Sequence, residues 1–144
     1  MNIDSIQNGY VIDHITAGTS MELYNALKLD TLDCCVAIIR NVTSTKMGKK
    51  DIIKIDALID LDMDVLGYID AGVTVNIVRN GVIEEKCNIR LPEEIRDVIR
   101  CDNPRCITSI EQELPQIFRL ADEEHHLYRC IYCDTAAKPY QRII

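Results

Sequence analysis

The chain is poor in aromatic residues and glycine, and it lacks the short motifs that identify common enzymes. Its 144 residues include no tryptophan, one phenylalanine, six glycines and four prolines. It contains no Walker loop, dinucleotide-binding glycine pattern, nucleophile elbow or HExxH motif. We therefore expect an aliphatic core built from Ile, Val and Leu, and we expect no catalytic activity.

Positive charge is also scarce, because 16 Lys and Arg stand against 23 Asp and Glu and the net charge is -7. This balance argues against general binding of nucleic acid or anionic membranes. No apolar run approaches the length of a membrane span, and the N-terminus does not resemble a secretory signal. We expect a cytoplasmic protein, whose thiols stay reduced and bind metal rather than form disulfides.

Four of the seven cysteines form two close pairs near the end of the chain, Cys101 with Cys106 and Cys130 with Cys133. This spacing is typical of one tetrahedral zinc ion held by four thiolates. A closed shell of four sulfurs leaves no open position for a substrate, so the predicted zinc is structural. The other cysteines and the nearby histidines are interpreted as small buried hydrophobes (Cys34, Cys35, Cys87) and surface residues (His125, His126).

Residues 1–91 alternate between strand and helix patterns in the order of a ferredoxin-like βαββαβ sandwich with one extra strand. Helices are predicted after Thr19 or Ser20 and from Asp62. The apolar run 34–42 predicts a central strand, and Asn80-Gly81 predicts a hairpin turn. The remaining strands are predicted at residues 10–15, 51–59, 73–78 and 82–89, with a hairpin turn at residues 47–50.

Residues 92–144 contain the metal cysteines and predict a small, β-rich, zinc-ribbon-like domain, which gives the chain an α+β class overall. Pro92-Glu93-Glu94 has the composition of a helix start, so we expect a helix from Pro92 through Ile95 to Cys101. The piece is too small for a large core, and zinc is expected to supply much of its stability.

One strand of the first domain has an unusual polar face, on which Lys50, Ile52 and Lys54 alternate with buried positions. An aliphatic side chain between two lysines suits a nucleotide, with Lys86 as a further cation, and an ordinary solvated strand face explains the same pattern. Asp13 and His14 are neighbours on a strand and need not share a face.

Taken together, these segments resemble one known family, the regulatory chain of aspartate carbamoyltransferase. The resemblance covers nearly the whole chain and rests on GYVIDHI (9–15), MGKKDIIKI (47–55), TVN (74–76), LPE (91–93), CDNPRCI (101–107) and CIYC (130–133). It implies a non-catalytic subunit of pyrimidine biosynthesis that binds the effectors ATP, CTP and UTP through residues 1–91. It further implies a homodimer through that domain, docking of the zinc domain on the catalytic chain, and no nucleic-acid or membrane partner.

The resemblance also implies roles for individual residues. His14, Lys50 and Lys86 are expected to face the phosphates, and Asp13 and Lys54 the ribose, with Lys54 also near the base. The backbone around Ile6 is expected to frame the base. The full implied effector site is Ile3, Asp4, Ile6, Val11, Asp13, His14, Lys50, Ile52, Lys54, Asn76, Val78, Ile83 and Lys86.

Two features of the sequence qualify this site. Gly81 stands where the family often has a bulky side chain beside the base, and Ile83 and Lys86 share a face only if a bulge lies between them. Two other classes of function remain as alternatives: a free-standing zinc-ribbon protein that binds nucleic acid or another protein, and a metalloenzyme.

Overall fold

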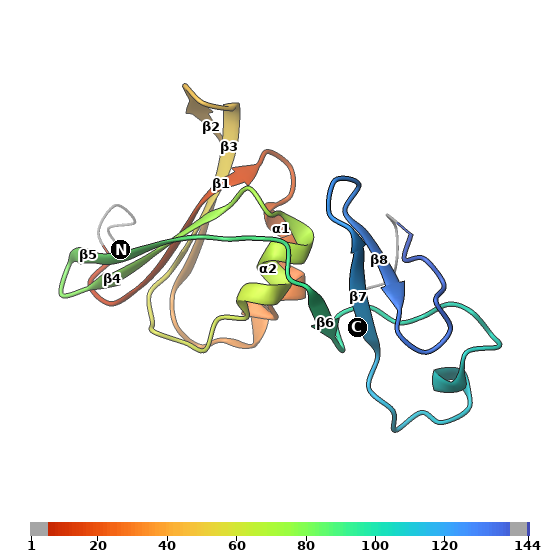
Figure 1. Ribbon diagram of the computed structural model, residues 1–144. Helices are drawn as coiled ribbons and strands as arrows, with labels where there is room; N and C mark the ends of the chain where they lie inside the picture. Colours follow the sequence, from red (N-terminus) through yellow and green to blue (C-terminus); the bar gives the residue numbers. More distant parts are fainter. Residues whose placement is uncertain (1–5, 139–143) are drawn as a thin grey trace. The chain divides into compact units, whose positions relative to one another are not determined.

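The computed structural model describes residues 6–138 and 144, and the chain divides into two compact units, Met1–Arg90 and Leu91–Ile144. Each unit has its own antiparallel sheet (Figure 1). Strands predominate, and the described residues form two α-helices and two short 3-10 helices. The predicted α+β class is confirmed. None of the helices in the described part is long and apolar enough to cross a bilayer.

The first unit is a five-stranded sheet in the order β2-β3-β1-β4-β5, in which every neighbouring pair is antiparallel. Strand β1 lies between β3 and β4, which is the arrangement expected of a split βαβ sandwich with an added fifth strand. Its elements are β1 (Gly9–Thr16), α1 (Ser20–Ala26), η1 (Leu29–Thr31), β2 (Val36–Ser44), β3 (Gly48–Ile55), α2 (Met63–Ile69), β4 (Thr74–Arg79) and β5 (Val82–Asn88).

Both helices pack on the same face of this sheet. Leu23 of α1 and Leu66 of α2 belong to one buried cluster with Ile12, Ile53 and Val75, which are neighbours across the three central strands. Successive residues of a strand point to opposite faces, so the residues next to these along each strand lie on the other face, which we call the open face. The open face contains the candidate effector residues.

Strand β2 corrects one prediction, because it lies at the edge of the sheet and not at its centre. Its apolar run led to the error. Val36 and Ile38 pair with the buried Ile55 and Ile53, but Ala37 and Ile39, which alternate with them, are half-buried on the open face opposite Lys54 and Ile52. A continuous apolar run therefore does not require burial on both faces.

Strand β3 begins and ends earlier than predicted, at Gly48 and Ile55 rather than at residues 51 and 59. The hairpin before it turns at residues 45–47, two to three residues earlier than expected, and the amide of Met47 donates to Ser44 Oγ there (3.1 Å). Gly48 follows with a φ of 78°, a left-handed conformation that favours glycine. The Asn80-Gly81 turn between β4 and β5 is confirmed, and both of its residues have positive φ.

The second unit is a three-stranded sheet in the order β6-β7-β8, with a 3-10 turn beside the first cysteine pair. Its elements are β6 (Glu94–Arg96), η2 (Ile107–Ser109), β7 (Ile117–Asp122) and β8 (Leu127–Cys130). The helix predicted from Pro92 is wrong, since Glu94–Arg96 pairs with β7. Exposed Glu94, buried Ile95 and exposed Arg96 follow the strand period of two, and this pattern outweighs the capping signal.

The three remaining cysteines are only partly as predicted. Cys34 and Cys87 are half-buried and pack against the core of the first unit. Cys35 is exposed, because neighbours in an extended segment point in opposite directions.

Candidate metal centre and effector surface

The side chains of Cys101, Cys106, Cys130 and Cys133 converge, with all four sulfurs within 4.8 Å of one another. The Sγ atoms of Cys101 and Cys133 are 3.6 Å apart, and those of Cys106 and Cys130 are 3.8 Å apart. A disulfide needs about 2.05 Å, so neither pair is bonded. Four sulfurs at about 2.3 Å from a tetrahedral zinc ion stand about 3.8 Å from one another, so this set fits a structural metal.

Each cysteine pair has a threonine that lies two residues after its second cysteine. The hydroxyl of Thr108 donates to Cys106 Sγ (3.1 Å), and Thr135 Oγ1 lies 3.1 Å from Cys133 Sγ. Asn103 Nδ2 donates to Thr135 Oγ1 (3.2 Å), which leaves the Thr135 proton for the sulfur. Such bonds orient metal ligands and stabilise their charge. The repeated Cys-x-Thr pattern was a sequence signal that the predictions did not use.

Without a bound cation, the surroundings of the thiols give them different pKa values. Burial raises the pKa of Cys101 and Cys130. Burial also opposes ionisation of Cys133, but hydrogen bonds from Thr135 outweigh it and lower the pKa of Cys133 to about 6. The arrangement thus supplies one ready thiolate, and a bound cation would hold Cys101 and Cys130 in their charged form.

The histidines of the second unit lie on its surface, as predicted. His125 and His126 are exposed in the turn between β7 and β8. His125 Nδ1 pairs with the carboxylate of Asp122 (2.7 Å). The cluster of candidate metal ligands found among the described residues contains the four cysteines and neither histidine.

In the first unit, the open face carries a row of candidate effector residues across four strands. Lys54 of β3 is opposite Val11 of β1, Val11 is opposite Asn76 of β4, and Asn76 is opposite Lys86 of β5. Opposite residues in antiparallel strands share a face, so two lysines flank an apolar and an amide side chain. At the usual strand spacing the row is about 14 Å long.

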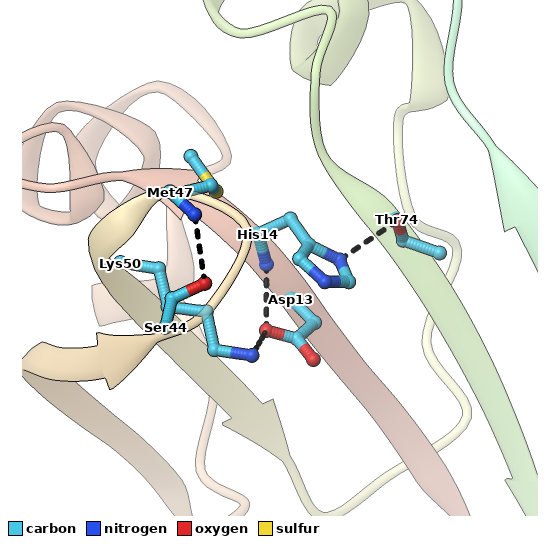
Figure 2. Close-up of polar contacts among 6 residues, drawn as sticks. All are labelled: Asp13, His14, Ser44, Met47, Lys50 and Thr74. Atoms are coloured by element: carbon cyan, nitrogen blue, oxygen red, sulfur yellow. Dashed lines mark hydrogen bonds and ion pairs between the residues drawn. The ribbon is translucent and has the colours of Figure 1, made fainter.

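A β-bulge brings Asp13 and His14 together at one end of this face. The pairing of β1 with β3 shifts between Ile12 and Ile15, and His14 has a φ of 59°. As a result, Asp13 Oδ1 accepts from both Lys50 Nζ (2.9 Å) and the His14 amide (2.6 Å), as Figure 2 shows. The expectation that these neighbours need not cooperate is corrected here, since bulges redirect side chains that would otherwise alternate.

At the same end of the face, polar contacts hold the side chains of Asp13 and His14 in place. His14 Nδ1 lies 3.1 Å from Oγ1 of Thr74, a buried residue that the sequence predictions missed (Figure 2). Burial disfavours the charged form of Asp13, but the bond from Lys50 and the His14 amide outweigh it and hold the pKa below its usual value. Asp13 is therefore a charged acceptor beside the cation Lys50.

In the middle of the face, Asn76 has a buried side-chain oxygen with no hydrogen-bond partner among the described residues. Buried acceptors are nearly always satisfied in native proteins, and each exception calls for a reason. A polar ligand lying on the lysine row would supply the missing donor.

A second bulge resolves the question about Ile83 and Lys86. Ile77 pairs with Glu85, but the next residue, Val78, pairs with Ile83, so Glu84 is the extra residue of β5. Ile83 and Lys86 therefore lie on the same face, opposite Val78 and Asn76 respectively.

The other candidate residues are placed as follows. Ile52 is half-buried on the open face opposite Ile39, and Val78 is buried beside Gly9. Ile6 is half-buried just before β1. Ile3 and Asp4 lie outside the described residues.

Comparison with known proteins identifies the family of the chain and the two domains that compose it. Residues 1–90 match the family model for the allosteric domain of the aspartate carbamoyltransferase regulatory chain, and residues 93–141 match the model for its metal-binding domain. The chain belongs to this family. Relatives with the same description include those of Clostridium tetani, at 50% identity over 96% of both chains, and Clostridium botulinum strain Hall, at 50% identity over 93% of this chain and 92% of the relative. The chain of Bifidobacterium longum is 48% identical over 96% of this chain and 99% of its own. The protein is thus a regulatory, non-catalytic chain with an allosteric and a metal-binding domain.

Proposed function

We propose that this chain senses nucleoside triphosphates on the open face of its first unit and transmits that signal to the catalytic chain of aspartate carbamoyltransferase. The effectors are of the ATP, CTP and UTP type. The observation that carries the proposal is the alignment of Lys54, Val11, Asn76 and Lys86 in one row, with Lys50, His14 and Asp13 at its end. On a chain of net charge -7, a local group of cations is needed to attract a polyanion.

The chemistry of the face divides a nucleotide into parts. Lys50, Lys86 and His14 bind the phosphates, because ammonium groups and ring N–H groups donate to anionic oxygen. The charged carboxylate of Asp13 accepts from a ribose hydroxyl. Lys54 donates near the ribose and base, and Asn76 pairs its orphaned oxygen with a ligand donor.

Regulation requires an effector that binds two quaternary states with different affinity. ATP, CTP and UTP share a triphosphate, so the lysines cannot choose among them. The difference must arise at the base, near Ile6, Gly81 and Ile83. A coupling of about 1–3 kcal/mol is ordinary for such switches.

We test the pocket with Lys54→Ala and with Lys49→Ala, which removes the same charge from an exposed position of the same strand. Lys49 alternates with the open-face lysines, so its loss is expected to change affinity little. Lys54→Ala is expected to weaken ATP and CTP binding about tenfold in calorimetric titrations, as for a charge-assisted hydrogen bond. Equal effects of the two variants would contradict the assigned pocket.

In the second unit we propose that one Zn²⁺ bound by Cys101, Cys106, Cys130 and Cys133 stabilises the fold that docks on the catalytic chain. A zinc-binding domain of this size owes much of its folding free energy to the metal. Cys106→Ser is expected to lose zinc and to abolish the complex in sedimentation velocity, and Cys87→Ser, in the first unit, is expected to retain both. An intact complex after complete chelation would contradict this role.

We further propose that two chains pair through their first units and that the assembly works in the cytoplasm. A reducing compartment keeps the four thiols available for metal. Sedimentation equilibrium of the zinc-loaded chain is expected to report a dimer. A monomer at all concentrations of the full chain would contradict the pairing.

A further inference from the structure

The open face changes character along its length. The end near Lys50 is cationic and the middle row contains two lysines, but the far end contains the apolar side chains of Val78 and Ile83. A ligand with an anionic tail and a flat heterocyclic head would place its head at the far end. The residues that surround that end are therefore the ones able to distinguish one base from another.

Gln7 lies beside the turn of the β4–β5 hairpin, and Figure 1 shows this hairpin at one end of the sheet. The amide of Gly81 donates to the carbonyl of Gln7 (2.9 Å), and the Asn80 amide donates to Asn8 Oδ1 (3.2 Å). These two bonds fix residues 7 and 8 beside the turn. Gln7 is four residues from Val11, so its Cα lies at most about 14 Å from the lysine row.

The side chain of Gln7 occupies the space that a side chain on residue 81 would need. A Cβ built on Gly81 meets Gln7 Oε1 at 3.2 Å and Nε2 at 3.6 Å, and the φ of Gly81 is 78°. Glycine at this position therefore leaves room for the Gln7 amide at the apolar end of the face. The amide offers a donor and an acceptor in a place where the apolar residues offer neither.

We propose that Gln7 is a specificity-determining residue whose side-chain amide hydrogen-bonds the edge of the nucleobase. The inference rests on the proposed function of the open face and deepens it. Because a glutamine amide can present either its oxygen or its nitrogen, it accepts from the exocyclic amino group of cytosine and donates to the O4 carbonyl of uracil. The native residue thus tolerates both pyrimidines, and a residue restricted to one role would favour one of them.

The substitution Gln7→Glu restricts the side chain to accepting hydrogen bonds and changes its shape little. An ionised carboxylate only accepts hydrogen bonds, so it suits the cytosine amino group and opposes the uracil carbonyl. Its added charge weakens all triphosphates, but this effect cancels in the ratio of two affinities. We expect the preference for CTP over UTP to rise about fivefold over the native ratio, in line with one hydrogen bond. Gln7→Ala is expected to weaken CTP and UTP without this increase.

Asn8→Asp is the matched control, because it adds the same charge one residue away while its Oδ1 remains an acceptor for the Asn80 amide. It is expected to leave the CTP/UTP ratio within twofold of native. Both affinities are measured by calorimetric titration of the zinc-loaded full chain with CTP and with UTP.

The results separate the inference from the function on which it rests. If the native chain binds neither triphosphate, the proposed function fails and the inference fails with it. If the native chain binds both and Lys54→Ala weakens both, but Gln7→Glu leaves the ratio within twofold, the function stands and the role of Gln7 is overturned. An equal shift in Asn8→Asp also overturns it, since charge alone then explains the effect.

Discussion

Replacement of Asp51 by alanine is expected to destabilise the first unit by about 4 kcal/mol, although Asp51 touches none of the proposed ligand positions. Its side chain is fully buried, and its carboxylate accepts three backbone amides from two other segments. These are the amides of Gly18 (3.0 Å) in the turn before α1, of Ser20 (3.4 Å) at the first position of α1, and of Asn41 (2.9 Å) in β2. A single side chain thus ties the β1–α1 turn and the edge strand to β3.

The magnitude follows from the three bonds taken separately. The two short bonds, to Gly18 and Asn41, involve a charged acceptor and are each worth about 1.5 kcal/mol. Both residues are exposed, so water replaces part of what is lost. Ser20 is fully buried, and leaving its amide without a partner costs about 1 kcal/mol more, even though that bond is long.

The pH dependence has a definite sign. Burial opposes the charged form of Asp51, but the hydrogen bonds from Ser20, Asn41 and Gly18 outweigh it and lower the pKa below its usual value. A carboxylate with a lowered folded pKa stabilises the native state above the unfolded value, about 3.9. This contribution is fully present at neutral pH and is lost as the pH falls through the folded pKa. The difference in stability between native and Asp51→Ala chains should therefore shrink in acid.

The assay is urea unfolding of the zinc-loaded chain, combined with hydrogen exchange of peptides that cover residues 16–21 and 39–43. Asp51→Ala should lower the unfolding midpoint of the first unit and speed exchange in both peptides. Asp56→Ala, at an exposed position just past the same strand, should change stability by less than about 0.5 kcal/mol. Equal losses in the two variants, or unchanged exchange at Gly18 and Asn41, would refute the reasoning.

Three further predictions concern single contacts. Gly9→Ala should cost about 3 kcal/mol in urea unfolding, because its Cβ would meet the Ile55 carbonyl at 1.9 Å, whereas Gly72→Ala, whose Cβ meets only Asp70 Oδ1 at 3.5 Å, should be nearly neutral; similar losses would contradict this. Thr135→Val should lower the affinity for zinc about tenfold in chelator competition, and Thr135→Ser, which keeps the hydroxyl, should not. Equal zinc affinities of the two variants would show that the hydroxyl does not contribute to metal binding. Asp62→Ala should destabilise the first unit by about 1 kcal/mol through loss of the α2 cap, with exposed Asp64→Ala as a milder control measured by the same unfolding curve.

Local patterns in the sequence were sufficient for much of the first unit. The alternation around Ile53 and Ile55, the Asn80-Gly81 turn and the cap at Asp62 each predict a structure from a few adjacent residues, and each is found. The central position assigned to residues 34–42 was wrong, because the rank of a strand within a sheet depends on which strands it pairs with. That pairing is a long-range property that a local apolar run does not encode.

In the second unit, too, a local sequence signal gave a wrong prediction because it does not encode long-range strand pairing. Pro92-Glu93-Glu94 is a sound local signal for a helix, yet the chain forms a strand there because Ile95 is buried against β7 in a sheet completed by residues more than twenty positions later. The metal cluster predicted from the cysteine spacing is found despite this error, since convergence of the four sulfurs depends on two tight turns and not on the elements between them. The hydroxyls of Thr108 and Thr135 were visible in the sequence as a repeated spacing and were overlooked.

The effector face could be foreseen only in part, for a physical reason. Strict alternation correctly places Lys50, Ile52 and Lys54 on one face, but it separates Asp13 from His14 and Ile83 from Lys86. Both pairs are brought to the open face by bulges, one marked by His14 in a left-handed conformation and one by the extra residue Glu84. A bulge adds a residue to one strand, so it turns neighbours that would point apart into partners. Deletion of Glu84 leaves Ile83 and Lys86 two positions apart, so regular alternation alone keeps them opposite Val78 and Asn76 on the open face. The folded deletion variant is therefore expected to bind nucleotides nearly as tightly as the native chain in calorimetric titration, and a large loss of affinity would show that the bulge itself, and not only the shared face, belongs to the site.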